Sequence, residues 1–135
     1  MKNVLLGVVL LVLTSAAPIE KFPVSAVIPT ADITAQIKQD KLNNYVIVIT
    51  ANYLASVERL TPPKNTYVLW LVTKENGTAN VGQFKNENAK KVTFQTLTPF
   101  EPLQLIITAE DEGKVTTPGT VEITRLALKN AQLNH

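Results

Sequence analysis

Residues 66–84 read TYVLWLVTKENGTANVGQF, and this stretch decides the fold. Two runs rich in β-branched and aromatic side chains flank Asn76-Gly77, the one Asn-Gly pair of the chain. Asn-Gly between two such runs is the strongest short-range signal for a β-hairpin, because both residues tolerate the left-handed backbone of a tight turn. The stretch therefore predicts a hairpin, and it contains Trp70, the single tryptophan.

A two-residue turn at the Asn-Gly pair predicts how the two strands of this hairpin oppose each other. Trp70 then opposes Gln83, and Val72 opposes Val81. One face collects side chains typical of a core, namely Tyr67, Leu69, Leu71, Gly82 and Phe84. The other face collects a mixed set, namely Val68, Trp70, Val72, Val81, Gln83 and Lys85. A shift by one residue exchanges the two faces, so the placement of Trp70 depends on the turn.

The rest of the chain continues as short strands separated by turn residues. We expect strands over residues 23–28, 32–39, 44–52, 66–73, 81–85, 91–97, 103–109 and 120–125. The first is flanked by prolines, as in an edge strand, and 44–52 is continuously apolar, which predicts a central strand covered on both faces. Tandem prolines in 54–65 predict a loop that crosses between sheets. The pattern indicates an all-β fold, a single antiparallel Ig-like β-sandwich of about eight short strands.

The N-terminus predicts export. Lys2 precedes an unbroken apolar run over residues 4–13, and small residues follow at 14–17. This arrangement is typical of a signal peptide. The run is shorter than the ~20 residues that span a bilayer, so we expect no stable membrane span in the mature chain. We divide the 135 residues into a signal peptide, 1–17, and one β-sandwich domain, 18–135, in the periplasm or outside the cell.

Few residues suggest chemistry. The chain has no cysteine, and its single histidine is His135, the last residue, so the sequence predicts no enzyme, no cofactor and no metal centre. The net charge is +2, and no basic cluster exceeds Lys90-Lys91, which argues against nucleic acid as a partner. The acidic residues 110–112, followed by Gly113, are expected to form a solvated turn, with a calcium site as the alternative.

Two kinds of binding remain open. The mixed hairpin face, with Trp70, Gln83, Val72 and Val81, is the candidate partner-binding face for a protein of the cell envelope. The plainer expectation is that another segment, such as the N-terminal strand or the C-terminal tail, covers Trp70. Exposed aromatic side chains would instead suit a carbohydrate-binding or adhesion module, and the candidates for such a role are Tyr45, Tyr53, Tyr67 and Trp70.

Residues 46 to about 125 resemble the extracytoplasmic domain of anti-sigma-K-type factors (the Rsk type). Three motifs carry the resemblance in order, namely VIVITANYL at 46–54, YVLWLVTKENGTANVGQF at 67–84 and LQLIITAEDEGKVTTPGTV at 103–121. The resemblance implies an outer β-sandwich that senses or binds protein. Such factors also carry a cytoplasmic zinc-associated domain that holds the sigma factor, and this sequence shows no such domain. Residues 112–114, Glu-Gly-Lys, also stand where the family often has Gly-Gly-Ser.

Overall fold

The computed structural model describes residues 17–86 and 90–129. These residues form strands and one short 3₁₀ helix, η1 (Val57–Arg59). The strands are β1 (Ile19–Lys21), β2 (Asp32–Gln39), β3 (Tyr45–Asn52), β4 (Thr66–Thr73), β5 (Gly77–Phe84), β6 (Lys91–Thr98), β7 (Gln104–Glu110) and β8 (Glu122–Ala127). No helix in this part of the chain is long and apolar enough to cross a membrane.

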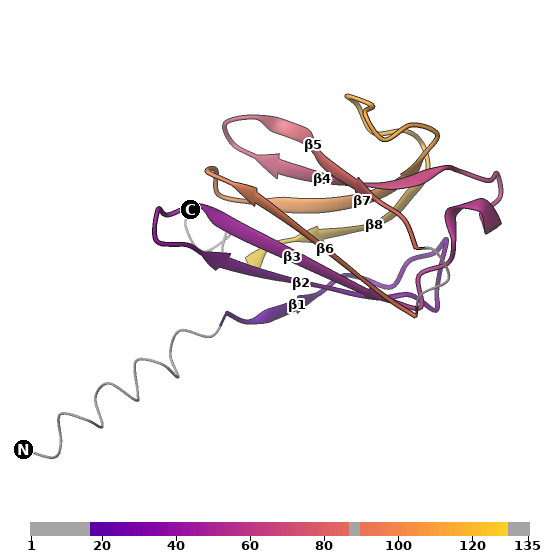
Figure 1. Cartoon of the computed structure of the whole chain (residues 1–135), viewed down its shortest axis with the longest axis horizontal. Coiled ribbons are helices and arrows are strands. Elements are labelled where there is room, and N and C mark those ends of the chain that lie inside the picture. The colour runs from indigo at the N-terminus through magenta and orange to yellow at the C-terminus, as the bar shows by residue number, and fades with distance from the viewer. Residues whose placement is uncertain (1–16, 87–89, 130–135) are drawn as a thin grey trace, which may run out of the picture.

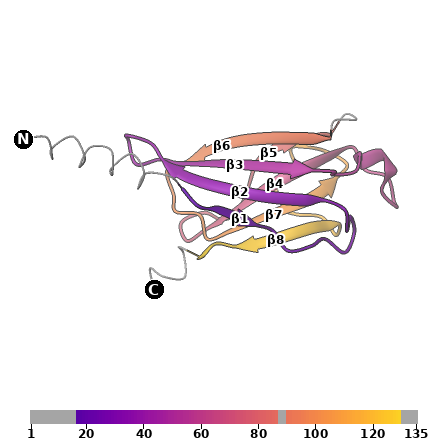
Figure 2. The same ribbon diagram turned by 90° about the horizontal axis from the view of Figure 1, so that it is seen from below.

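The strands form two sheets of four strands that pack face to face (Figures 1 and 2). The first sheet has the order β1-β2-β3-β6 and the second has the order β5-β4-β7-β8. All neighbouring strands are antiparallel. The predicted all-β sandwich of about eight strands is confirmed. The proline-rich segment after β3 crosses between the two sheets, as predicted, because β3 and β4 belong to different sheets.

The main core lies between the sheets and takes one residue in two from each central strand. Ile47 and Ile49 of β3 face Leu69 of β4 and Leu105 and Ile107 of β7 across this space, and each is at most 1% exposed. Alternation of this kind places every second side chain on the same face of a strand. Burial of these branched side chains is the main stabilising contribution, at about 1.5–3 kcal/mol for each.

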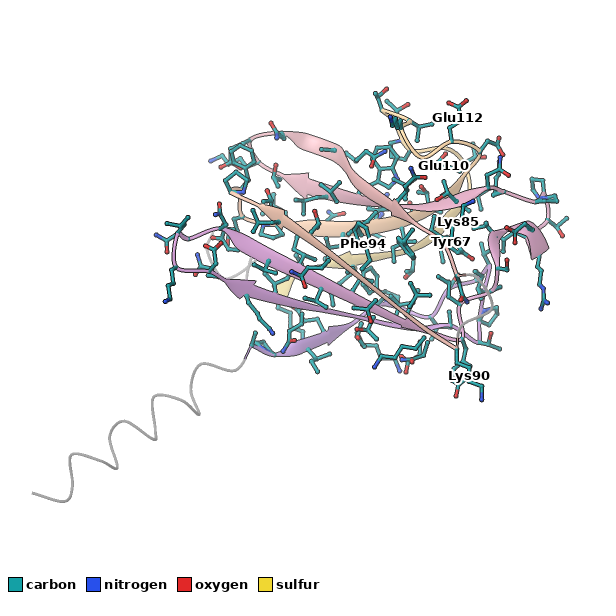
Figure 3. The ribbon with its side chains drawn as sticks, viewed as in Figure 1. Tyr67, Lys85, Lys90, Phe94, Glu110 and Glu112 are labelled. Carbon is teal, nitrogen blue, oxygen red and sulfur yellow. The ribbon has the colours of Figure 1, made fainter. Side chains whose placement is uncertain are left out.

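Three aromatic rings form a short stack between β4, β5 and β6. The rings of Tyr67 and Phe84 are stacked with centroids 5.5 Å apart, and those of Phe84 and Phe94 are tilted with centroids 5.4 Å apart. Figure 3 labels the two outer members, Tyr67 and Phe94. The Tyr67 hydroxyl donates a hydrogen bond to the carbonyl of Ala55, and burial raises the pKa of this phenol. The stack therefore joins the two sheets where β5 and β6 lie next to each other.

One strand prediction is wrong, and another is wrong in part. Residues 23–28 form no strand; instead the Ser25 hydroxyl accepts hydrogen bonds from the N–H groups of Val27 and Ile28, which bends the chain. Residues 19–21 pair with β2 in their place. Strand β3 is central, as predicted, but only its inner face is fully buried, because its outward side chains are half-exposed.

The hairpin of β4 and β5 forms, but its predicted register is wrong. Three residues, rather than two, separate the paired residues Thr73 and Gly77, and a bulge follows between Leu69 and Trp70. Trp70 opposes Asn80, and Gln83 opposes Val68. Relative to the predicted register, the turn and the bulge together shift the pairing of residues 67–69 with residues 82–84 by two positions. An even shift leaves each of these side chains on its predicted face of the sheet. The predicted core face is therefore correct.

The bulge explains why Val81 is misplaced by the prediction. Val81 has no partner on β4, and its side chain packs against the main core rather than beside Trp70. Gly82 follows with φ 143°, and a Cβ atom there would lie 2.5 Å from the Phe94 ring. A glycine is required at this position, both for the backbone and for the approach of the ring.

Candidate functional site

A second, smaller apolar cluster lies on the outer face of the second sheet. It consists of Val68, Trp70 and Ile106, with Val72 and Val115 packed against them. Trp70 is fully buried, at 0% exposed. Val115 belongs to the loop 111–121 between β7 and β8, which we call the cover loop. The expectation that another segment covers Trp70 is confirmed, and among the described residues the cover comes from this loop.

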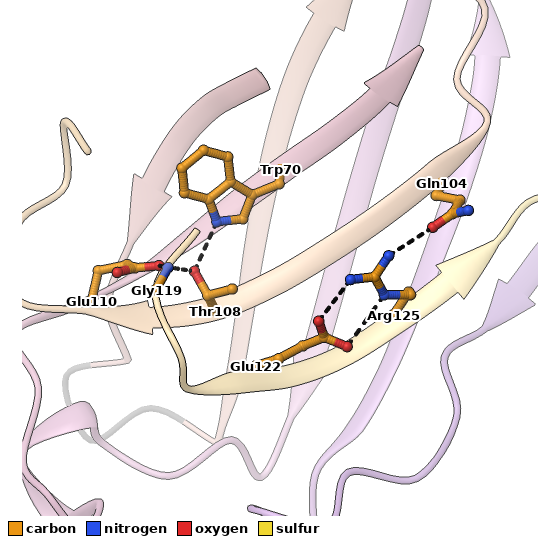
Figure 4. Close-up of polar contacts among 7 residues, drawn as sticks. All are labelled: Trp70, Gln104, Thr108, Glu110, Gly119, Glu122 and Arg125. Atoms are coloured by element: carbon orange, nitrogen blue, oxygen red, sulfur yellow. Dashed lines mark hydrogen bonds and ion pairs between the residues drawn. The ribbon is translucent and has the colours of Figure 1, made fainter. Parts of the chain in front are cut away.

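Buried polar contacts hold the far end of the cover loop. The Trp70 indole N–H donates to the Thr108 hydroxyl at 2.7 Å, which donates to a carboxylate oxygen of Glu110 at 2.6 Å (Figure 4). The same oxygen accepts the N–H of Gly119 at 2.9 Å. A Cβ atom on Gly119 would lie 2.7 Å from the other Glu110 oxygen, so glycine permits this close approach. Charge-assisted hydrogen bonds are stronger than neutral ones, so Glu110, 6% exposed, is a firm anchor.

A second anchor holds the middle of the cover loop to β5. The Asn80 amide nitrogen donates to the carbonyls of Gly113 and Val115, both at 2.9 Å. Its oxygen accepts the N–H of Gly82 at 2.9 Å. The register that runs from the turn places Asn80 opposite Trp70 and under the loop, directly before the bulge at Val81. The asparagine side chain therefore links the cover loop to the edge of the sheet.

The start of the cover loop is tied to the segment before β4. The Asn65 side chain donates to the carbonyl of Asp111 at 3.0 Å, and the Lys64 ammonium lies 3.6 Å from the Asp111 carboxylate. The three residues of the predicted acidic turn thus have different roles. Glu110 is buried under the cover loop, Asp111 pairs with Lys64, and Glu112 is an exposed residue of the loop (Figure 3). Within residues 17–86 and 90–129 no group of three acidic or histidine side chains could hold a metal ion.

A groove of about 670 Å³ lies between β5 and the cover loop. One wall is a continuous run of β5 and the other is the middle of the loop. The lining residues are Thr78, Ala79, Asn80, Val81, Gly82 and Gln83, with Gly113, Lys114, Val115 and Thr116. Their side chains offer hydroxyl and amide groups and one ammonium. The groove carries two of the predicted binding residues, Val81 and Gln83, and we take it as the candidate binding site.

The four residues of the predicted partner-binding face separate in the structure. Trp70 is buried under the cover loop, so it is not open to a partner, and Val72 is half-buried beside it. Gln83 is exposed and lines the groove, with its side chain against Gly113. Val81 also lines the groove, although its side chain packs toward the main core. The groove therefore adjoins the predicted face but is made mainly by other residues.

Sequence reasoning missed the groove residues of the cover loop and Asn80. The loop contained a usable signal, because Pro118-Gly119 is a turn pair and the segment is too long for a tight hairpin. The loop is held by Asn80, whose place beside the bulge at Val81 depends on the length of the hairpin turn, and the alternation of the strand reveals neither the turn length nor the bulge.

A second hollow, of about 340 Å³, lies where β3 leaves the first sheet. Tyr53 lies at its rim with φ 56°, a left-handed backbone that is rare for a bulky residue, and its side chain is 64% exposed. Arg59 and Lys90 also line this hollow. Of the aromatic residues considered for sugar stacking, Tyr67 and Trp70 are buried, Tyr45 is half-buried, and Tyr53 is exposed.

Comparison with protein-family models, with curated proteins and with solved structures finds no match to this chain. The resemblance to the outer domain of anti-sigma-K-type factors therefore stays a prediction from the three sequence motifs.

Proposed function

We propose that this chain is an exported, non-enzymatic β-sandwich that binds another protein, as an interaction or sensing module of the cell envelope. The observation that carries the proposal is the groove between β5 and the cover loop. Strand β5 is an edge strand of its sheet, and residues 78–83 of it line one wall. The bulge at Val81 interrupts regular pairing along the whole edge, so the edge suits a short extended segment only. The backbone N–H and C=O groups of the strand on either side of the bulge can pair with those of such a peptide.

The side chains of the groove also suit a polypeptide. Thr78, Gln83 and Thr116 supply hydroxyl and amide groups, which both donate and accept hydrogen bonds with peptide groups. Lys114, exposed on the opposite wall, adds one positive charge that favours an acidic residue in the bound segment. The groove therefore favours an extended, slightly acidic segment of a partner.

The walls of this groove are held in place before any partner arrives. Asn80 fixes the middle of the cover loop, and Glu110 fixes its far end through Gly119. A partner then loses little affinity to the ordering of the loop, because that ordering is already complete. This pre-organisation supports a binding role over a purely structural one for the loop.

Export and a role in signalling belong to the same proposal. The apolar run at residues 4–13 supports export, and the three motifs resembling anti-sigma-K-type outer domains support sensing or regulation. The mature N-terminus, read by mass spectrometry from the exported fraction, would lie near residue 18. Retention of the full-length chain in the cytoplasm would contradict export. A neighbouring gene for a sigma or anti-sigma factor would support the signalling part.

The groove itself is tested by two exposed threonines of the cover loop. Thr116 lines the groove and Thr120 does not, so Thr116→Trp fills the groove and Thr120→Trp is the matched control. Each variant is immobilised and exposed to an envelope extract of the source cells. We expect one protein to be retained by the wild type and by T120W, and to be lost with T116W. Equal retention by T116W excludes the groove, and retention of no specific protein by the wild type contradicts the proposed function.

One observation favours a second candidate function, carbohydrate binding. The exposed ring of Tyr53 lies beside the hollow that Arg59 and Lys90 line, and an aromatic ring next to cations suits an acidic sugar. Isothermal titration with peptidoglycan fragments would detect binding, which Tyr53→Ala should abolish. Tyr45→Ala, at the opposite end of β3, is the control. A flat titration of the wild type would remove this candidate.

A further inference from the structure

The four edge strands of the sandwich differ in how they are protected. Strand β1 has three residues, and β5 carries the bulge at Val81. Strand β8 lies against the segment after β1, where the Thr124 hydroxyl donates to the carbonyl of Pro23 at 2.8 Å. Short length, bulges, covering segments and charged side chains, especially lysine, are the usual means of preventing edge-to-edge pairing. Strand β6 has none of the first three within the described residues, because it is eight residues long and pairs with β3 in unbroken register. Its one charged residue, Lys91, stands at its very start.

The register tells which backbone groups of β6 point away from β3. The Tyr53 N–H donates to the carbonyl of Lys90 at 2.9 Å, which extends the ladder of β3 and β6 by one hydrogen-bonded pair. Hydrogen-bonded pairs alternate along an antiparallel ladder. The backbone groups of every second residue therefore point to the open side, and these residues are Lys91, Thr93, Gln95 and Leu97. Their side chains are all exposed, and Leu97 is 55% exposed.

This open edge is complementary to itself. In an antiparallel pair of two copies, Lys91 can oppose Leu97, and Thr93 can oppose Gln95. Every outward N–H and C=O group of the four residues then has a partner on the other copy. Lys91 is the one charged residue of β6, and the two copies of it lie at opposite ends of the pair, so no like charges meet. The lysine stem covers part of Leu97 while the ammonium stays in water.

We propose that β6 is the interface between two copies of this chain, which pair through it across a two-fold axis. The two β1-β2-β3-β6 sheets then form one continuous sheet. A second copy is favoured over a segment of another protein, because an antiparallel copy of β6 places a compatible side chain opposite each of the four outward residues. This pairing also brings no like charges together. The pairing involves one strand from each copy, which places the dimer among weak, concentration-dependent complexes. The proposal is independent of the groove, which lies on the other sheet.

Analytical ultracentrifugation of the mature protein tests the proposal at concentrations from about 10 µM to about 1 mM, the range of weak complexes. We expect the wild type to shift from monomer to dimer over this range. Gln95→Lys should weaken the dimer at least tenfold, because the new ammonium groups approach each other across the axis. Gln39→Lys, on an exposed residue of β2 in the same sheet, should leave it unchanged.

Mixing two variants identifies the strand pairing itself. Gln95→Glu places each new carboxylate diagonal both to its own copy across the axis and to Lys91 of the second copy, so the two effects oppose each other and the dimer of this variant should change little. Fluorescently labelled Q95K should form dimers when unlabelled Q95E is added, because opposite charges then face each other. A wild type that stays monomeric throughout overturns the proposal and leaves the edge open to a strand of another protein. A dimer that Q95K leaves intact, or a mixture that restores nothing, also overturns it.

Discussion

The outer faces of the two sheets differ in how far they are covered. On the second sheet, the cover loop buries Trp70 completely and leaves a groove beside it. On the first sheet, Val46 and Val48 of β3 stay half-exposed and Leu97 of β6 is open. The two central strands, β3 and β4, are about equally apolar in sequence. A covered face therefore depends on polar anchors, here Asn80 and Glu110, that lie outside the apolar run.

The largest effect should come from removing the side chain under the cover loop. Trp70→Ala leaves a large cavity and removes the donor to Thr108, so we expect a loss of about 3–5 kcal/mol in the free energy of unfolding. Val48→Ala, on the open face, should cost about 1 kcal/mol, because that side chain is only half-buried. Urea unfolding measures both. Equal costs would show that the two faces do not differ in burial.

The bulge next to Asn80 depends on Gly82. Gly82→Ala combines a backbone that L-residues avoid with a Cβ atom 2.5 Å from the Phe94 ring, so we expect a loss of about 2–4 kcal/mol. Gly77→Ala is the control, since its φ is 60° and no atom lies near the added carbon. It should cost about 1 kcal/mol. Thermal unfolding measures the loss of stability in both variants. Equal losses would show that the contact between the added Cβ atom and the Phe94 ring does not add to the cost.

The anchor at the far end of the cover loop is tested at Glu110. Glu110→Ala leaves the Thr108 hydroxyl and the Gly119 N–H without their acceptor, which should cost about 1–3 kcal/mol. Hydrogen exchange should speed up over the cover loop and stay unchanged in the first sheet. Glu112→Ala, on an exposed residue of the same loop, should change stability by less than about 0.5 kcal/mol. Unchanged exchange in the loop of the Glu110 variant would contradict the anchor.

The smallest effect concerns the exposed side of β8. Arg125 binds both carboxylate oxygens of Glu122 and also contacts Gln104 (Figure 4). The bond from Arg125 lowers the pKa of the Glu122 carboxyl, so the pair adds stability above the ordinary pKa of a glutamate and loses it as pH falls through the lowered value. Arg125→Gln should cost at most about 0.5 kcal/mol at neutral pH, since the pair is exposed.

Urea unfolding at pH 7 and at a pH below the lowered value checks the sign of this effect. The difference between R125Q and the wild type should vanish at the lower pH. A difference that persists there would show that Arg125 acts through packing and not through its charge.

Much of the fold could be predicted because alternation and turn residues are local. The alternation of β2 and the tandem prolines after β3 gave correct elements, and the core face of the hairpin was also correct. The hairpin register was wrong because an Asn-Gly pair is compatible with more than one loop length, and Val81 gives no local sign of a bulge.

The candidate site was harder to predict, for a physical reason. The groove needs β5 and the cover loop, which are about thirty residues apart, to meet on the outer face. Their meeting depends on one amide, that of Asn80, reaching the carbonyls of Gly113 and Val115. Contacts between side chains and a distant backbone leave no periodicity in the sequence, so pattern reasoning found the neighbourhood of Trp70 but not the loop over it.

The indole of Trp70 gives the protein an optical signal of its own. It is the single tryptophan, it is fully buried, and its N–H is bonded to Thr108 beneath the cover loop. Its emission should therefore be that of an indole shielded from water, and any event that lifts the loop should move the emission to longer wavelength. The state of the loop can then be followed in real time without an attached dye, in the same sample in which a ligand or a partner is added.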